Sequence, residues 1–356
     1  MLPSPFEIRL EIATRCGRLP SNSHQLKQEP GMATTLEITF LHSQLEERKR
    51  RLETAITLAP QSSGLAGLLR QVDSALDRMS KGSYGLCQEC HESIEQDRLL
   101  ADPLVCYCLD HLSDSQRAAL QRDLDLASAV QRNLLPESNL RAGDWETSYH
   151  YAPVGPVSGD YCDLIPSGGE LFFVVGDVSG KGVAASMLMT QLHALFRSLS
   201  GMGLPLGQMI TQANRVFCES ALAGQYATLV CGQAKANGEV EIHNAGHWPL
   251  IIVGRGGVLR IESTGLPLGM FCDSDFSATR VHLESGDTMF LYTDGLLEAR
   301  RGDDEYGVDR VAHLLRQQAE RRPCEVVAAC LDDMRAFADG PPLDDLALLA
   351  IQRVAL

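Results

Sequence analysis

The sequence predicts an α+β protein, because its two halves have different patterns of apolar residues. Up to about residue 136, apolar residues recur at helical spacing, which indicates helices. Within this part, cysteine and histidine residues are spaced as in a metal-binding knuckle. From about residue 143 onward, short apolar runs lie next to glycine or aspartate, as strands bounded by turns do. We therefore expect a helical hairpin with a zinc finger, a helical linker and a C-terminal domain of strands and helices.

The composition is that of a globular protein with an acidic second half. The 356 residues leave room for about two domains of roughly 150 residues each. Hydrophobic residues make up 44% and charged residues 22%, which allows a sizeable core. The net charge is −15, and residues 144–356 contribute most of it, with 15 basic and 27 acidic residues. This balance argues against direct nucleic-acid binding and favours a site that gathers cations.

The chain shows no targeting or membrane segment. No apolar run approaches the roughly 20 residues that span a bilayer, and the N-terminus lacks the apolar stretch of a signal peptide. We therefore expect a cytoplasmic protein without membrane contact, in which the 11 cysteines are free thiols or metal ligands. Residues 1–32 hold several prolines and little periodicity, so we expect a loose leader, with Met32 as an alternative start.

The helical part begins with two stretches, 36–58 and 65–79, separated by a short turn, which predicts an antiparallel hairpin. A linker helix should follow over 113–136, because Ser113 and Gln116 fit a capping box and Pro136 stops a helix. A heptad seam along this helix consists of Leu120, Leu124, Ala127, Gln131 and Leu134. The seam predicts either packing on the next domain or a two-stranded linker, and we favour a homodimer through this helix.

Between hairpin and linker lie two ligand pairs at the spacing of a zinc ribbon. The spacing is C-x2-C, then seventeen residues, then C-x2-H, and the ligands are Cys87, Cys90, Cys108 and His111. Two such turns can close on one tetrahedral zinc ion, and four protein ligands leave no open position, so the site should be structural. Cys106 and His91 are the competing ligands. A redox switch that releases zinc on oxidation is a further interpretation.

Four acidic motifs mark the C-terminal half. Asp160 lies in the first, and Asp177 follows the apolar run 171–175 in a glycine-rich loop. Asp294 comes directly after a strand-like run, and Asp344 and Asp345 come directly before another. Carboxylates at strand ends repel one another unless cations neutralise them, and oxygen ligands suit Mg²⁺ or Mn²⁺. The motifs therefore predict a site for Mg²⁺ or Mn²⁺ in this half of the chain.

Other motifs in this half have structural interpretations. The loop 176–182 is not a P-loop, because three residues rather than four separate Gly176 from Gly180-Lys181 and no serine or threonine follows. Lys181 should face solvent, with contact to a phosphate as the alternative, and His247 should be a structural histidine in a turn. The cysteines of this half that we expect in the core are Cys162, Cys218, Cys231 and Cys272.

The N-terminal pattern resembles the DksA/TraR zinc-finger family over about residues 36–112. The helical hairpin, the Tyr-Gly before the first cysteine, Arg98-Leu99, Pro103 and the knuckle spacing support this resemblance, with His111 where the family usually has cysteine. Members of that family reach into RNA polymerase with acidic residues at the hairpin tip. The tip here, 59–63, has no carboxylate. We therefore favour a sensing or dimerising module, and a DksA-like polymerase regulator with the C-terminal half as scaffold is the alternative function.

The C-terminal series SGDYCDL, GDVSGKGVAASMLM, NAGHWP, PLGMF, YTDGLLEAR and DDLALLAI resembles the SpoIIE/RsbU-type branch of the metal-dependent (PPM) serine/threonine protein phosphatases, over about residues 143–356. The resemblance implies an α-β-β-α sandwich with two Mn²⁺ or Mg²⁺ ions at one end. It implies that Asp177 bridges both ions together with the Val178 carbonyl, that Asp294 and Asp344 complete one ion, and that Asp160 binds the other.

The same resemblance implies a function and a partner. Asp177 and Asp160 would be the catalytic residues. Asp163 and Asp345 would lie next to the metal ligands without binding the ions directly. The substrate would be a phosphorylated regulatory protein, an anti-sigma-factor antagonist or a related STAS-like protein. The zinc-finger module would regulate this protein-serine/threonine phosphatase.

Overall fold

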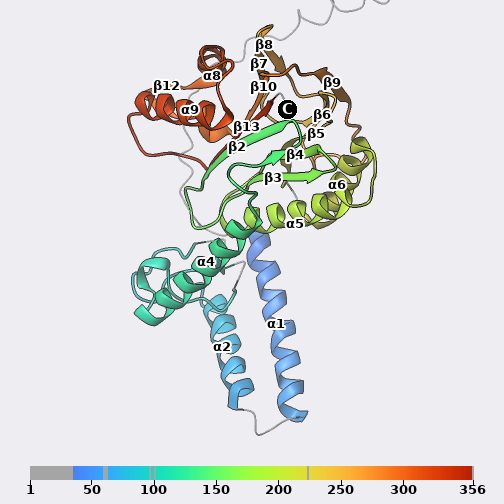
Figure 1. Cartoon of the computed structure of the whole chain (residues 1–356). Coiled ribbons are helices and arrows are strands. Elements are labelled where there is room, and N and C mark those ends of the chain that lie inside the picture. The colour runs from blue at the N-terminus through green and yellow to red at the C-terminus, as the bar shows by residue number, and fades with distance from the viewer. Residues whose placement is uncertain (1–34, 59–62, 96–97, 100–101, 223, 355–356) are drawn as a thin grey trace, which may run out of the picture. The chain divides into compact units, whose positions relative to one another are not determined.

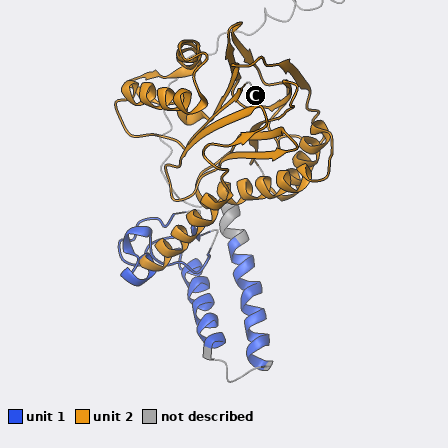
Figure 2. Ribbon diagram, in the orientation of Figure 1, with its two compact units in different colours: residues 1–117 blue, residues 118–356 orange. Residues whose placement is uncertain are grey.

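Two antiparallel sheets form the centre of the C-terminal part of the computed structural model (Figure 1). The structure describes residues 35–58, 63–95, 98–99, 102–222 and 224–354. The expected leader and alternative start, residues 1–32, and most of the expected hairpin tip therefore lie outside the described residues. The chain divides into two units, residues 1–117 and 118–356, which Figure 2 colours separately.

The first unit contains the predicted helical hairpin. Its helices are α1 (Thr35–Leu58) and α2 (Ser63–Ser80). Leu45, Val72 and Ala75 form their shared core, and Lys49 pairs with Asp73 at 2.8 Å across the hairpin. A second small core includes the predicted zinc ligands Cys87 and Cys108. The 3-10 helix η1 (Leu109–His111) follows it in the chain.

The linker helix α4 (Asp114–Leu134) begins and ends close to its predicted limits. Its N-terminus has the predicted capping box, because the Gln116 backbone N–H donates to Ser113 Oγ at 3.3 Å and the Ser113 N–H donates to Gln116 Oε1 at 3.1 Å. These bonds satisfy two backbone donors that a helix start leaves free.

The second unit is the predicted α-β-β-α sandwich. Its six-stranded sheet has the order β1-β2-β13-β10-β7-β8, and its five-stranded sheet has the order β3-β4-β5-β6-β9. The strands of the first are β1 (Arg141–Ala142), β2 (Trp145–Ala152), β13 (Leu346–Arg353), β10 (Thr288–Tyr292), β7 (Leu250–Gly254) and β8 (Gly257–Ile261). Those of the second are β3 (Asp160–Ser167), β4 (Glu170–Val178), β5 (Ala227–Ala234), β6 (Glu239–Ala245) and β9 (Ala278–His282).

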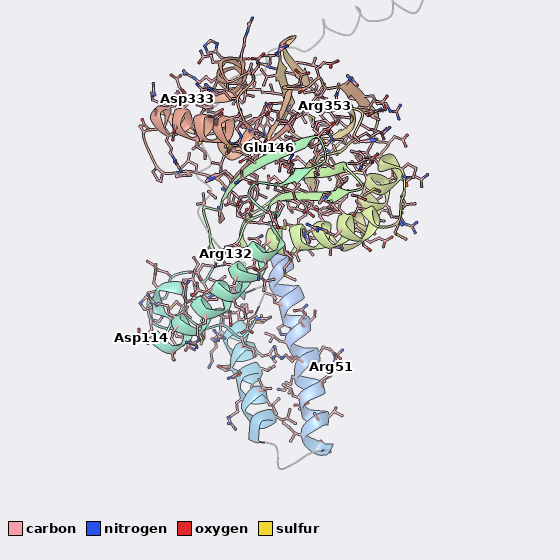
Figure 3. The ribbon with its side chains drawn as sticks, in the orientation of Figure 1. Arg51, Asp114, Arg132, Glu146, Asp333 and Arg353 are labelled. Atoms are coloured by element: carbon pink, nitrogen blue, oxygen red, sulfur yellow. The ribbon has the colours of Figure 1, made fainter. Side chains whose placement is uncertain are left out.

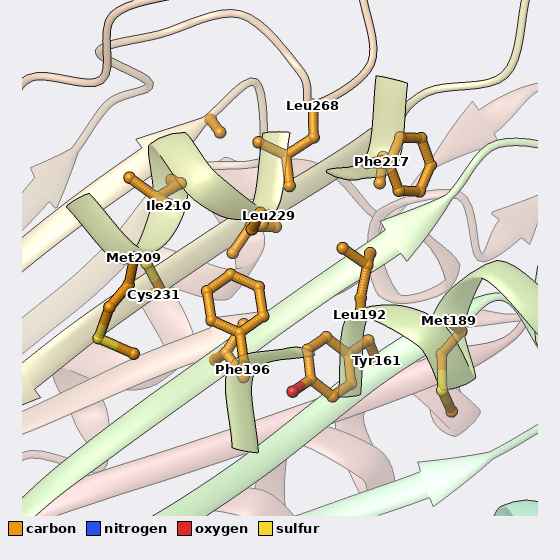
Figure 4. Close-up of a cluster of buried hydrophobic side chains, with 14 of the residues drawn as sticks. Tyr161, Met189, Leu192, Phe196, Met209, Ile210, Phe217, Leu229, Cys231 and Leu268 are labelled. Atoms are coloured by element: carbon orange, nitrogen blue, oxygen red, sulfur yellow. The ribbon is translucent and has the colours of Figure 1, made fainter. Parts of the chain in front are cut away.

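Three layers of buried side chains hold this sandwich together. The middle layer lies between the sheets and includes Trp145, Phe173 and Leu349. On one outer face α5 (Gly182–Ser200) and α6 (Leu206–Ser220) pack on the five-stranded sheet through a cluster that includes Phe196 (Figure 4). On the other outer face α8 (Gly307–Gln317) and α9 (Pro323–Phe337) pack on the six-stranded sheet. Burial of these large apolar side chains is the main stabilising contribution.

Polar contacts fix the edges of these layers. Glu146 on β2, which Figure 3 labels, accepts a charge-assisted hydrogen bond of 2.7 Å from Arg322, which precedes α9. Tyr306 donates to Asp333 of α9 at 2.6 Å. The remaining elements are the short helix α7 (Asp294–Leu297) and the two-residue strands β11 (Arg300–Arg301) and β12 (Asp304–Glu305). No helix in the described ranges is long and apolar enough to cross a membrane.

Candidate metal centres

Asp160 and Asp177 lie directly opposite each other at one end of the five-stranded sheet. Asp160 is the first residue of β3, and its Cα pairs with that of Asp177 near the end of β4. Side chains alternate along a strand, so both carboxylates share a face with Cys162 and Val175, which belong to the core between the sheets. Both aspartates therefore point toward the gap between the two sheets.

The six-stranded sheet brings the other predicted aspartates to the same end. Asp294 follows β10 and begins α7, while Asp344 and Asp345 precede β13, the antiparallel neighbour of β10. The side chain of Thr293 connects the sheets, because its Oγ1 accepts from the Ala347 N–H at 2.9 Å and donates to Asp160 Oδ2 at 2.8 Å. Four separated segments of the sequence thus meet at one place.

Three carboxyl groups of this cluster, those of Asp160, Asp177 and Asp294, have raised pKa values. Burial, reinforced by the charges of Asp294 and Asp344, raises the pKa of Asp177 from 3.8 to about 7. Burial and the Asp344 charge raise that of Asp294 to about 6. Burial and the Asp177 charge raise the pKa of Asp160 well above its usual range, although the Thr293 hydrogen bond opposes this. Several negative charges in a desolvated place are unfavourable unless cations balance them.

The backbone around the cluster is close-packed. A Cβ on Gly159 would lie 2.8 Å from the Val178 carbonyl oxygen and 3.3 Å from Asp177 Oδ1, and a Cβ on Gly295 would overlap the Asp345 carbonyl oxygen. Only glycine allows these approaches. The Val178 carbonyl therefore lies beside the Asp177 carboxylate, where oxygen ligands for Mg²⁺ or Mn²⁺ can converge. The donor set and its raised pKa values fit such cations.

Lys181 is mostly exposed and its Nζ lies 2.8 Å from Asp344 Oδ2. The expected exposure is thus confirmed, and the partner is a predicted metal ligand. Asp345 accepts a hydrogen bond of 2.7 Å from the Val154 N–H, which orients its carboxylate at the rim of the cluster.

Asp163 does not support the cluster, contrary to expectation. It is three residues beyond Asp160 and therefore lies on the opposite face of β3. There its carboxylate is fully buried and accepts two hydrogen bonds, at 2.7 and 2.6 Å, from Arg197 of α5. Its function is to attach α5 to the sheet.

His247 is structural, as predicted. It is buried, its Nε2 lies 3.0 Å from the Tyr292 carbonyl oxygen and its Nδ1 lies 2.9 Å from Thr228 Oγ1, so it bridges the two sheets behind the cluster. Burial lowers its pKa to about 4, which keeps the ring neutral.

The core assignment of the cysteines is correct for two of them. Cys162 and Cys231 are buried, but Cys218 is only partly buried and Cys272 is exposed. Cys272 lies in the long connection between β8 and β9. The short apolar pattern around it had suggested a buried position, but no strand forms there.

In the first unit the predicted zinc ligands lie together. The ligand atoms of Cys87, Cys90, Cys108 and His111 are all within 4.8 Å of one another. The Cys90 and Cys108 sulfurs are 3.8 Å apart, which matches the roughly 3.8 Å that two sulfurs at 2.3 Å from a tetrahedral zinc ion would have. Cys106 and His91, the competing ligands, are not in this group. The four side chains fit a zinc ion.

Gln131 is a site residue that the sequence reasoning placed in an apolar seam. It is buried, and its amide donates to the Ser158 carbonyl at 2.7 Å and accepts from the Ser158 N–H at 3.0 Å. Ser158 Oγ in turn accepts from the Asp160 N–H at 3.0 Å. The linker helix therefore holds the loop that carries Asp160. A polar residue at a seam position was the available signal.

Residues 167–354 match the model of the family described as Stage II sporulation protein E (SpoIIE). The phosphoserine phosphatase RsbU of Bacillus subtilis (strain 168) is 24% identical over 241 residues, which cover 66% of this chain and 71% of RsbU. The protein IcfG of Synechocystis sp. is 27% identical over 263 residues, 65% of this chain. The match spans only 41% of IcfG.

Two solved structures are similar in fold. The RsbU and RsbW domains of Rv1364c from Mycobacterium tuberculosis are 28% identical with a TM-score of 0.54, over 61% of this chain and 62% of theirs. The SiaA-PP2C domain of Pseudomonas aeruginosa has a TM-score of 0.58 at 19% identity, over 67% of this chain and 98% of that domain. The sandwich is therefore a PP2C phosphatase fold.

Proposed function

The chain belongs to the SpoIIE family, and on that premise we propose that it is a metal-dependent protein-serine/threonine phosphatase. The observation that supports this most is the convergence of Asp160, Asp177, Asp294 and Asp344 at one end of the sandwich. Raised pKa values in this cluster fit a site that is completed by cations.

Each aspartate has a distinct part in this proposal. Asp177 would bridge two Mn²⁺ or Mg²⁺ ions, joined by the Val178 carbonyl, with Asp294 and Asp344 on one ion and Asp160 on the other. When bound, the two ions supply an acidified water molecule and neutralise charge on the phosphate. Thr293 orients Asp160 through its hydrogen bond of 2.8 Å. Lys181 balances Asp344 and lies where it can also approach a phosphate oxygen.

The substrate in this proposal is a phosphoserine or phosphothreonine on a regulatory protein. The similarity to the phosphoserine phosphatases RsbU and RsbP of Bacillus subtilis supports this class. Within it we propose an anti-sigma-factor antagonist or a STAS-like protein. The match covers 46% of RsbP, so the proposal takes nothing from the rest of RsbP.

Hydrolysis of p-nitrophenyl phosphate with and without Mn²⁺ tests the activity. We expect Mn²⁺-dependent turnover by the wild type and a loss of at least about 100-fold in Asp177→Asn, because one bridging carboxylate serves both ions. Asp332→Asn, an exposed carboxylate on α9, is the matched control and should behave as wild type. Turnover that survives Asp177→Asn, or needs no metal, would contradict the mechanism.

We also propose that the first unit binds one structural zinc ion through Cys87, Cys90, Cys108 and His111 and regulates the phosphatase. The distances between the four ligand atoms, all within 4.8 Å, support the zinc site. Zinc content measured by elemental analysis should be one ion per chain and should fall in His111→Ala. Removal of residues 1–112 should change the rate or the oligomeric state, and an unchanged rate and state would exclude regulation by this unit.

The linker helix supports a homodimer in this proposal. Leu126 and Val130 of α4 are 66% and 52% exposed, and with Val183 and Met187 of α5 they line a groove of about 490 Å³. Exposed apolar side chains in one groove favour a second copy of the helix. Leu126→Glu should then produce a monomer in sedimentation measurements. The protein would act in the cytoplasm, where its thiols stay reduced.

A further inference from the structure

Large apolar side chains are exposed on loops beside the aspartate cluster. They lie in the α6–β5, β6–β7 and β8–β9 connections. Their exposed fractions are 71% for Leu222, 44% for Trp248, 49% for Leu266, 45% for Met270 and 62% for Phe271. We call these five residues the apolar rim. A single exposed apolar residue is ordinary on a protein surface, but several on connected loops mark an interaction site. The loops are connected, because Ala245 bridges Gly265 and Ala227 bridges Leu268.

Hydrogen bonds connect the rim loops to the strands of the site. Ala227 and Leu268 exchange backbone hydrogen bonds of 2.9 and 2.8 Å, and Ala227 pairs in β5 with Val178 of β4. The Ser179 N–H donates to the Tyr226 carbonyl at 2.9 Å, so the loop after Asp177 is joined to the α6–β5 connection. The rim loops are therefore joined to the strand end and loop that directly follow Asp177.

The loop that carries Met270 and Phe271 is held in a fixed shape. Asn214 of α6 is fully buried, and its amide donates to the Phe271 carbonyl at 2.9 Å and accepts from the Gly269 N–H at 2.9 Å. A Cβ on Gly269 would lie 2.7 Å from the Phe217 ring, so the loop is packed tightly on α6. A preorganised apolar surface loses little conformational entropy when a partner binds.

The chemistry of the site indicates which partner the rim serves. The carboxyl groups of the cluster are those of Asp160, Asp177, Asp294, Asp344 and Asp345, and Lys181 and two bound divalent cations would balance their charges. Such a site recognises a phosphate group and not the protein that carries it, so selectivity between phosphoproteins has to come from contacts outside the metal site. Phosphoserine is a short side chain, so a protein that presents it to Asp177 must cover the adjoining loops.

We propose that the apolar rim is the docking surface for the phosphoprotein substrate, an inference that rests on the proposed phosphatase function. The partner would have an apolar patch beside its phosphoserine. It would not be acidic there, because the exposed Asp273 and Asp275 border Phe271 in the same loop. Tryptophan, methionine and phenylalanine are enriched at such contacts, and a few of them dominate the binding energy.

Two methionines provide a matched test. Met270 lies in the rim, and Met202 is 67% exposed just after α5, at the end of the helix remote from the aspartates. The variants are Met270→Ser, Phe271→Ser and Met202→Ser. The substrates are p-nitrophenyl phosphate and a serine-phosphorylated STAS-domain protein, each with Mn²⁺. We expect the rim variants to lose about tenfold or more in kcat/KM on the phosphoprotein, mainly through KM, with unchanged turnover of p-nitrophenyl phosphate.

The outcomes separate the two proposals. Rim variants within twofold of the wild type on the phosphoprotein would overturn the docking surface, as would an equal loss on both substrates, which would mean that the rim only supports the catalytic loops. An equal effect of Met202→Ser would also overturn it. If the wild type hydrolyses neither substrate with Mn²⁺, the phosphatase proposal itself fails.

Discussion

Replacing Asp177 by asparagine should stabilise the metal-free protein at alkaline pH, although it should abolish activity. In the wild type the Asp177 pKa rises from 3.8 in the unfolded chain to about 7 in the folded one. The folded state therefore holds its proton up to about pH 7, whereas the unfolded state loses it near pH 4. Stability falls as the pH rises through this window.

At 1.36 kcal/mol per pKa unit, the penalty is on the order of 4 kcal/mol at pH 8 and about 2 kcal/mol at pH 5. Asparagine resembles the protonated carboxyl and carries none of this penalty. Urea unfolding in EDTA should thus give a gain in unfolding free energy for Asp177→Asn that is about 2–3 kcal/mol larger at pH 8 than at pH 5.

Mn²⁺ should reverse the order of stability of the wild type and Asp177→Asn. At pH 8, Mn²⁺ should stabilise the wild type by binding the folded state, and should stabilise Asp177→Asn much less. The control Asp332→Asn, on the exposed face of α9, should show neither effect. If Asp177→Asn is no more stable than the wild type at pH 8 in EDTA, charge repulsion does not govern this cluster and the reasoning is refuted.

Three further predictions follow from single contacts. Arg197→Met leaves the buried Asp163 with only the more distant His193, at 3.6 Å, and should lower the unfolding free energy by about 3 kcal/mol in urea titration. Thr293→Val removes the donor to Asp160 and the acceptor of the buried Ala347 N–H, so calorimetry should detect weaker Mn²⁺ binding and a thermal midpoint lowered by a few degrees. Cys108→Ser should lose zinc in elemental analysis and unfold the first unit, seen as lost helical circular dichroism, while p-nitrophenyl phosphate turnover persists.

Local patterns in the sequence predicted the helices of the N-terminal part and the strand-like runs beside the aspartates. Apolar periodicity predicted α1 and α2, and the capping box and Pro136 predicted α4, each to within a few residues. The resemblance to the PPM phosphatases put Asp294 and Asp344 at one site, and the structure brings them together because β10 and β13, which border them, are antiparallel neighbours. The zinc ligands were predicted from spacing alone, and their side chains do converge.

What the sequence missed depends on contacts between distant segments. Thr293 looked like the last residue of a strand, and only the approach of β3 across the gap makes its hydroxyl a partner of Asp160. Asp163 was grouped with Asp160 because they are close in sequence, but three positions along a strand reverse the face. Arg197, its true partner, is 34 residues away on α5. No local pattern encodes such a pairing.

Gln131 shows how the linker and the site are related. A heptad seam with a buried glutamine could have been a dimer interface, because a buried polar residue often fixes register in coiled coils. Instead its amide forms hydrogen bonds with both the carbonyl and the N–H of Ser158. The Ser158 hydroxyl in turn accepts a hydrogen bond from the Asp160 N–H. The exposed large apolar residues of α4 are Leu120 of the seam, at 41%, and Leu126 and Val130, which lie outside the seam, at 66% and 52%. Gln131 therefore connects α4 to the segment that carries Asp160, and this contact is separate from the exposed apolar residues of the helix.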